Sequence, residues 1–188
     1  MKKFTYLLVL ILSFGILNAQ ENTDNDTAVP NKSFKHELKL NMLELIVMPA
    51  IGITYEHYLN PYSSAGVYAF ANFGIDEELR HEKAELAPFY RIYFQRQKNA
   101  SNQGLFTEIF GGINYGETEF YDYDRSYYNS GKLLVQEYVG VAVGVTLGYK
   151  FVNYNNYTFD LFGGAGRYLN DQEVKAYPRI GLSIGKRF

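Results

Sequence analysis

The 188-residue chain contains no cysteine, no tryptophan and only three histidines. Beyond its first 20 positions it also lacks any run of about 18 apolar residues, the length that a membrane-spanning helix needs. Without cysteine, a disulfide framework, a thiol-based zinc site and a lipid-bearing cysteine are excluded. With 47% hydrophobic and 17% aromatic residues, the chain is too apolar to be intrinsically disordered. Plentiful glycine and aromatics without long apolar runs favour an all-β protein, and the length suits one domain.

The first 19 residues have the features of a secretory signal peptide. Two lysines precede an apolar stretch over 4–17, and Ala19 is a small residue at the expected cleavage site. The alternative is an uncleaved membrane anchor, but the apolar stretch is short for a helix that spans a membrane. Cleavage would remove two basic residues and no acid, leaving a formal charge of −4 that argues against a nucleic-acid partner. The polar, aperiodic segment 20–33 is predicted to be a flexible leader, followed by a barrel domain over 34–188.

Two-residue alternation is the strongest pattern in the rest of the chain. Across 139–151, every odd position is Val, Leu, Tyr or Phe, and every even position is Gly, Ala, Thr or Lys. Successive side chains of a strand point to opposite faces, so this segment is predicted to be a strand with one apolar face. The end of the chain repeats the pattern around Ile180 to Phe188. Less regular alternation marks further strands at 34–46, 50–59, 64–74, 85–95, 104–117 and 156–168.

Eight strands of this length can cross a bilayer at a tilt, and their connections alternate in length. The connections at 60–63 and 153–155 are tight and 96–103 is modest, whereas those at 75–84, 118–136 and 169–175 are longer and charged or tyrosine-rich. This arrangement is typical of an eight-stranded, antiparallel, up-and-down transmembrane β-barrel with both termini in the periplasm. The short first connection, 46–50, breaks the rule, and we expect it at the outer rim regardless.

A soluble, lipocalin-like barrel is the structural alternative, and the polar face of the strands argues against it. That face carries small residues, which suit the crowded lumen of an eight-stranded barrel rather than a water-facing surface. Alternation also assigns isolated charges of both signs to the lumen. Because buried charges must pair, we expect a salt-bridge plug, with a proton or ion path as the alternative. The predicted lumen charges are Lys39, Glu56, Arg91, Glu108, Asp160, Arg179 and Arg187.

The last strand carries a resemblance. Ile180, Leu182, Ile184 and Phe188 resemble the C-terminal signal of proteins that the bacterial barrel-assembly machinery inserts, although Lys186 departs from the apolar residue often found there. With the segments 38–41, 52–56 and 87–94, the mature chain resembles the small, uncharacterised outer-membrane barrels of Bacteroidota, which have an OmpA/OmpX-like architecture. The resemblance implies a fold, an outer-membrane location, contact with outer-membrane lipid and lipopolysaccharide, and no established reaction.

Catalytic and metal-binding patterns are weak. Serine hydrolysis needs a base beside the hydroxyl, and His36, His57 and His81 form no pair with serine like that of the lipid A acylase barrels. The acidic stretches 76–82 and 117–124 lack the glycine-punctuated spacing of a calcium loop. We therefore predict no catalytic residue, no metal site and no cofactor, with an outer-membrane lipid-modifying enzyme as a lesser alternative.

The connection at 118–136 is a candidate contact surface because aromatics alternate there with charged residues. Tyrosine and asparagine are efficient contact residues in binding loops. Extension of the strands beyond the membrane is the alternative reading. We expect a monomer that supports envelope integrity or binds an extracellular partner, lipopolysaccharide or polysaccharide, with a narrow pore or transporter component as the runner-up. The contact aromatics are Phe120, Tyr121, Tyr123, Tyr127 and Tyr128.

Overall fold

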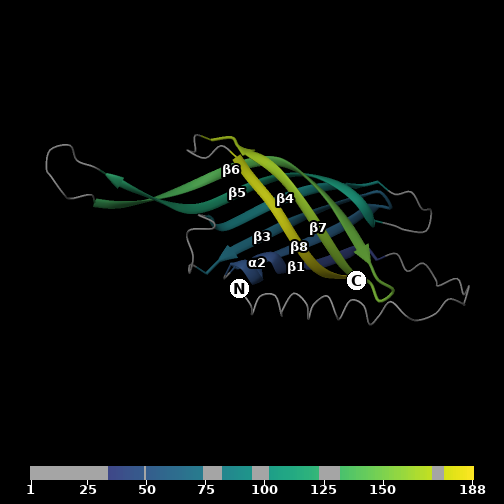
Figure 1. Cartoon of the computed structure of the whole chain (residues 1–188). Helices are drawn as coiled ribbons and strands as arrows, with labels where there is room; N and C mark the ends of the chain where they lie inside the picture. The colour runs from purple at the N-terminus through teal and green to yellow at the C-terminus, as the bar shows by residue number, and fades with distance from the viewer. Residues whose placement is uncertain (1–33, 49, 74–81, 95–101, 123–131, 171–175) are drawn as a thin grey trace, which may run out of the picture. The chain divides into compact units, whose positions relative to one another are not determined.

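The alternating segments form eight antiparallel strands that pair in chain order and close on themselves as a barrel (Figure 1). The computed structural model describes residues 34–48, 50–73, 82–94, 102–122, 132–170 and 176–188. The prediction of an all-β, eight-stranded, antiparallel barrel is confirmed. The predicted signal peptide and leader lie outside the described residues. The strands are β1 His36–Asn41, β2 Ala50–Asn60, β3 Ser63–Asn72, β4 Glu82–Tyr93, β5 Gly104–Asp122, β6 Lys132–Val152, β7 Tyr157–Tyr168 and β8 Ala176–Arg187.

Strand β1 closes the barrel because it pairs on both sides. Leu38 lies opposite Tyr55 of β2 on one side and opposite Lys186 of β8 on the other. Closure removes the sheet edges that an open eight-stranded sheet would leave unpaired. Within the part of the chain that the structure describes, no helix is long and apolar enough to cross a membrane.

The predicted strand over 34–46 is wrong in its second half. Strand β1 ends at Asn41, and the short helix α2 (Met42–Val47) follows. The Asn41 side chain caps this helix by accepting a hydrogen bond of 3.2 Å from the Leu43 backbone N–H. A continued strand would place Glu44 on the apolar outer face, since the even positions of β1 point outward. The helix instead buries Glu44, which accepts a hydrogen bond from the Tyr68 hydroxyl.

Strands β5 and β6 are longer than predicted, so most of the expected connection over 118–136 is strand. The extension ends at Asp122 of β5 and begins at Lys132 of β6, and these two residues pair with each other. The neighbouring strands stop earlier, because β4 reaches only Gly116 of β5 and β7 reaches only Ala142 of β6. The two strands therefore continue as a ribbon past the rest of the barrel, as Figure 1 shows.

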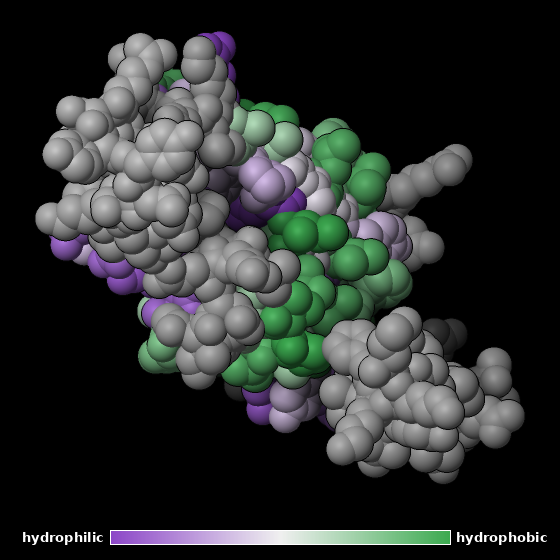
Figure 2. Space-filling model, turned by 60° about the vertical axis from the view of Figure 1, so that its left-hand side comes forward, coloured by the Kyte–Doolittle hydropathy of each residue, from purple (hydrophilic) through white to green (hydrophobic). Residues whose placement is uncertain are grey.

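The apolar positions of the strands lie on the outside of the barrel. In β6 the odd residues from Val139 to Phe151 are 38–61% exposed, whereas Ala142, Thr146 and Lys150 are buried. Figure 2 shows a large hydrophobic area on the face in view, with hydrophilic residues beside it. The core of this molecule is its lumen, which aromatic and charged side chains fill together.

Candidate functional site

The candidate site is the charged network of the lumen. Every second residue of a strand faces inward. The inward-facing residues have odd numbers in β1, β4 and β8 and even numbers in β2, β5, β6 and β7. This parity brings all seven of the charges assigned from the sequence to the inside, and each is at most 9% exposed. They are Lys39, Glu56, Arg91, Glu108, Asp160, Arg179 and Arg187.

Glu56 lies at the centre of this network and is fully buried. Its Oε2 accepts hydrogen bonds from Lys39 Nζ at 2.5 Å and from Lys150 Nζ at 2.9 Å. Arg91 Nη1 donates to the same oxygen at 3.3 Å, so three cations surround one carboxylate oxygen. The other oxygen, Oε1, accepts from the Ser64 hydroxyl at 2.5 Å. Both Glu56 oxygens are thus satisfied without water.

Arg91 joins three acids from three different strands. Besides Glu56, its Nη1 donates to Asp160 Oδ2 at 2.8 Å. Its Nε and Nη2 both donate to Glu108 Oε2, at 3.0 and 2.7 Å. Arg179 extends the network along the lumen, with Nη1 3.6 Å from Glu108 Oε1. A planar guanidinium with several fixed donors suits this bridging role better than a lysine would.

Sequence reasoning missed Glu37 and left Lys150 out of the network. Glu37 Oε1 accepts from Lys150 Nζ at 3.1 Å and from the Thr158 hydroxyl at 2.9 Å. Arg187 contacts Glu37 through its Nε at 3.2 Å, and this contact joins it to the network. The signal for Glu37 was present in the sequence, because Glu37 shares the parity of Lys39 on the same strand.

Aromatic rings enclose the cations. The Arg91 guanidinium lies 3.9 Å from the centre of the Phe106 ring, and the Arg187 guanidinium lies 4.7 Å from that of Tyr58. Such cation–π contacts gain strength where water is excluded. The hydroxyls of Tyr58 and Tyr93 also donate to Glu37 and Glu56, respectively. Rings and ion pairs together fill the lumen, whose width in an eight-stranded barrel accommodates little more than its own side chains.

The buried acids do not form a suitable metal site. Ligand atoms of Glu37, Glu56 and Asp160 lie within 4.8 Å of one another. However, the ammonium groups of Lys39 and Lys150 already occupy the space among them, each within 3.9 Å of all three acids. A divalent cation would have to enter beside two fixed positive charges. The arrangement is therefore that of an ion-pair cluster.

Two of the three histidines lie on the outer face at the end of the barrel that carries both termini of the 34–188 segment. His36 and His57 lie opposite each other across β1 and β2, with 3.3 Å between their Nδ1 atoms. His36 Nδ1 also lies 2.7 Å from the Tyr55 hydroxyl. Among the described residues, no hydrogen bond joins a serine to either histidine, and Ser64 faces the lumen. His81 lies outside the described residues.

The remaining predicted residues fall outside the lumen. The candidate assembly residues Ile180, Leu182 and Ile184 are on the outer side of β8, and Phe188 follows its end. Ile180, Ile184 and Phe188 are 43–67% exposed, and Leu182 is half-buried. Of the contact aromatics, Phe120 and Tyr121 belong to the β5 extension, while Tyr123, Tyr127 and Tyr128 lie outside the described residues. Comparison of the chain with family models, curated proteins and solved structures gave no match.

Proposed function

We propose that this chain is a bacterial outer-membrane β-barrel without catalytic activity, which reaches its location by means of an N-terminal signal peptide. Its lumen is plugged by the charged network, and its role is structural or interaction-based, either in envelope integrity or in contact at the cell surface. Its partners in this proposal are outer-membrane lipid, lipopolysaccharide and the barrel-assembly machinery that inserts it. The chain acts as a monomer.

A single observation carries the proposal: the barrel is apolar outside and charged inside. Leu147 of β6 is 61% exposed and Ile109 of β5 is 59% exposed, while Lys150 and Glu108 on the same strands are buried. A soluble barrel needs the opposite arrangement, since its outer surface meets water. Exposed apolar area on this scale marks contact with a membrane or with another protein. A hydrocarbon layer around the barrel supplies that contact on all sides.

The filled lumen favours a rigid plug over an open pore. In the charged network, five buried basic residues face four buried acids, and their contacts link β1, β2, β4, β5, β6, β7 and β8. An ion crossing this layer would have to separate pairs at 2.5–3.3 Å. Because these ion pairs hold different strands together, they support a structural role for the network.

The membrane location is tested by fractionation together with heat-modifiable migration. We expect the protein in the outer-membrane fraction, and we expect the unheated sample to migrate differently in electrophoresis from the boiled one because the barrel resists detergent. Recovery as a soluble periplasmic protein with identical migration before and after boiling would refute the membrane proposal.

The contact role is tested on the five contact aromatics of the segment 118–136. We expect whole-cell adhesion or envelope integrity to fall when five aromatics are replaced together by serine. They are Phe120, Tyr121, Tyr123, Tyr127 and Tyr128. Tyr154→Ser is the matched control, because Tyr154 is fully exposed in the turn at the opposite end of the barrel. Unchanged adhesion and integrity in the five-residue variant would contradict a contact role for these aromatics.

A further inference from the structure

The barrel wall has a gap beside β8, because β1 is short. Strand β1 pairs with β8 only from Ser183 to Arg187, although β8 begins at Ala176. Strand β1 also leaves β2 at Ile53, although β2 begins at Ala50. In the part of the chain that the structure describes, no strand fills the space between these two edges. The helix α2 lies there instead, beside β8 in Figure 1.

The edge of β8 is suited to remain without a strand partner. Phe188 N–H donates to the His36 carbonyl, so the even residues of β8 turn their backbone groups toward β1. At the gap, the Leu182 N–H donates to the Asn41 side chain at 3.4 Å instead of to a strand. Pro178 lies four positions before Leu182 on the same edge, and a proline has no backbone N–H that could be left unpaired. Proline in a sheet is found at such edges.

A pocket of about 280 Å³ opens at this gap and leads from the outer face into the lumen. Its outer part is lined by Leu43, Val47, Pro178 and Ile180, which are apolar. Its inner part is lined by Tyr68, Phe162 and Tyr177, together with the charged side chains of Glu44, Glu82 and Arg179. The pocket is thus apolar toward the outside and charged toward the inside, which is the polarity of an amphiphile.

Arg179 lines the pocket, and one of its buried donors is unsatisfied. Its side chain is 9% exposed and its guanidinium lies between two rings, 4.9 Å from the centre of Tyr68 and 4.5 Å from that of Phe110. Its buried Nη1 has no hydrogen-bond partner among the described residues, and the nearest acid, Glu108, is 3.6 Å away. A buried donor without a hydrogen bond is costly, so the group gains from an anionic ligand.

The pocket also contains negative charge. Glu44 is 5% exposed and lies on α2, and Glu82 accepts a hydrogen bond from the Tyr168 hydroxyl at 2.7 Å. Among the described residues that line the pocket, one arginine and two carboxylates disfavour a purely anionic ligand. They match a headgroup that carries both an anionic group and an ammonium with N–H donors.

We propose that this pocket binds the headgroup of a zwitterionic amphiphile that enters sideways from the bilayer. Arg179 binds the phosphate, and Glu44 binds a primary ammonium. The volume is below that of pockets for drug-sized molecules, so it takes the headgroup while the acyl chain lies outside, across Val47 and Ile180. The inference rests on the membrane location proposed above.

The absence of tryptophan from the chain allows a direct binding assay. Val47→Trp places one indole at the pocket, and Leu147→Trp places one on the exposed face of β6. The refolded variants, in micelles of a neutral detergent, are titrated with brominated lysophosphatidylethanolamine, which quenches tryptophan on contact. We expect saturable quenching at position 47, and only gradual, unsaturable quenching at position 147 from the shared micelle.

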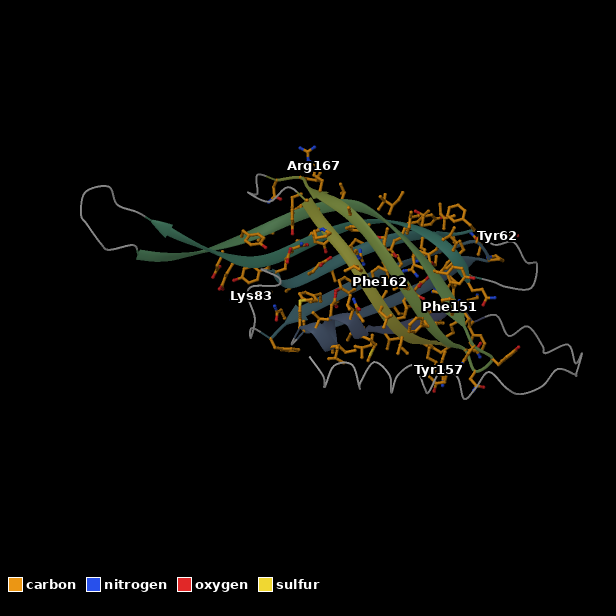
Figure 3. The ribbon with its side chains drawn as sticks, in the orientation of Figure 1. Tyr62, Lys83, Phe151, Tyr157, Phe162 and Arg167 are labelled. Carbon is orange, nitrogen blue, oxygen red and sulfur yellow. The ribbon has the colours of Figure 1, made fainter. Side chains whose placement is uncertain are left out.

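The headgroup preference and the side chains provide the decisive comparisons. Brominated lysophosphatidylcholine, whose ammonium has no N–H, should bind Val47→Trp about ten-fold or more weakly than the ethanolamine form. Adding Arg179→Gln should weaken binding by a similar factor. The matched control is Arg167→Gln, because Arg167 projects outward from the end of β7, as Figure 3 shows.

Each result has a defined meaning. Unsaturable quenching at position 47, or equal binding of the two lipids, overturns the pocket assignment. If Arg179→Gln does not refold, the headgroup comparison on the unaltered arginine still decides the proposal. Heat-modifiable migration of the same samples reports the barrel separately. A soluble protein would refute the membrane location, and the same titration below the critical micelle concentration would then test the pocket by itself.

Discussion

Removal of the charge at Glu56 should destabilise the barrel more than any comparable change on its surface. Glu56→Gln keeps the shape of the side chain and its capacity to accept from Ser64. It removes one of the charges that Lys39, Lys150 and Arg91 share. The lumen network then has five cations against three acids, and each of them is at most 9% exposed.

The magnitude follows from burial. Glu56 and Lys150 are fully buried, and Lys39 and Arg91 are nearly so. Breaking a buried pair by removing one partner costs about 3–5 kcal/mol, because an uncompensated charge is left in a poorly solvated site. We therefore expect the unfolding equilibrium constant to rise by about two to four orders of magnitude.

The assay is urea unfolding of the refolded barrel in detergent, with the fraction folded read from circular dichroism and extrapolated linearly to water. Glu117→Gln is the matched control, since it removes the same charge from a partly exposed pair in which Glu117 lies 2.5 Å from Lys83. Exposed pairs contribute about 0–1 kcal/mol, so this variant should change the free energy of unfolding little.

A double variant tests the cause. Lys39→Met combined with Glu56→Gln restores the charge balance, and the double variant should be more stable than the sum of the two single effects predicts, by about 1 kcal/mol or more. If Glu56→Gln changes the free energy of unfolding by less than about 0.5 kcal/mol, the scale of neutral surface substitutions, the reasoning is refuted. It would mean that water or a rearranged partner satisfies the cations.

Three further outcomes are expected. Gly164→Ala should lower the free energy of unfolding by about 1–3 kcal/mol, because a Cβ at this position overlaps the Val145 carbonyl oxygen. Gly163→Ala should be tolerated, because a Cβ there has no atom within 4 Å. Equal effects of the two substitutions would contradict this packing. If the barrel spans a membrane as proposed, Leu147→Arg should cost about 2–4 kcal/mol in lipid and Tyr154→Arg about 0–1 kcal/mol. A neutral Leu147→Arg would argue for a water-facing wall. The refolded protein should show no stable conductance in planar bilayers, and regular single-channel steps would favour the pore alternative.

The sequence predicted the strands well where each face has one chemical character. In β6 and β8 the alternation is nearly perfect, and the structure has strands there. It failed at α2, where apolar residues on both sides of Glu44 resemble a fully buried strand, and the capping by Asn41 was not recognised. It also failed at the ribbon, because charged and aromatic residues in 118–136 resemble a loop although their backbones pair.

The candidate site was partly visible in the sequence. Parity along a strand is local, so it assigns Lys39 and Arg91 to the lumen without knowledge of the neighbours. Which acid each cation meets depends on barrel register, which local alternation leaves open. Glu37 and Lys150, 113 positions apart, became partners only through that register.

The sequence alone determined that the chain is all-β, that its strands number eight, and which side of most strands is apolar, because these properties depend on residues two positions apart. Only the tertiary structure decided that β1 ends early, that α2 lies at the resulting gap, and that Arg179 lines a pocket there. Those features depend on where a strand stops relative to neighbours far away in sequence. The closing of β8 on β1 joins the two ends of the barrel segment, and no local pattern records how much of β8 is left uncovered.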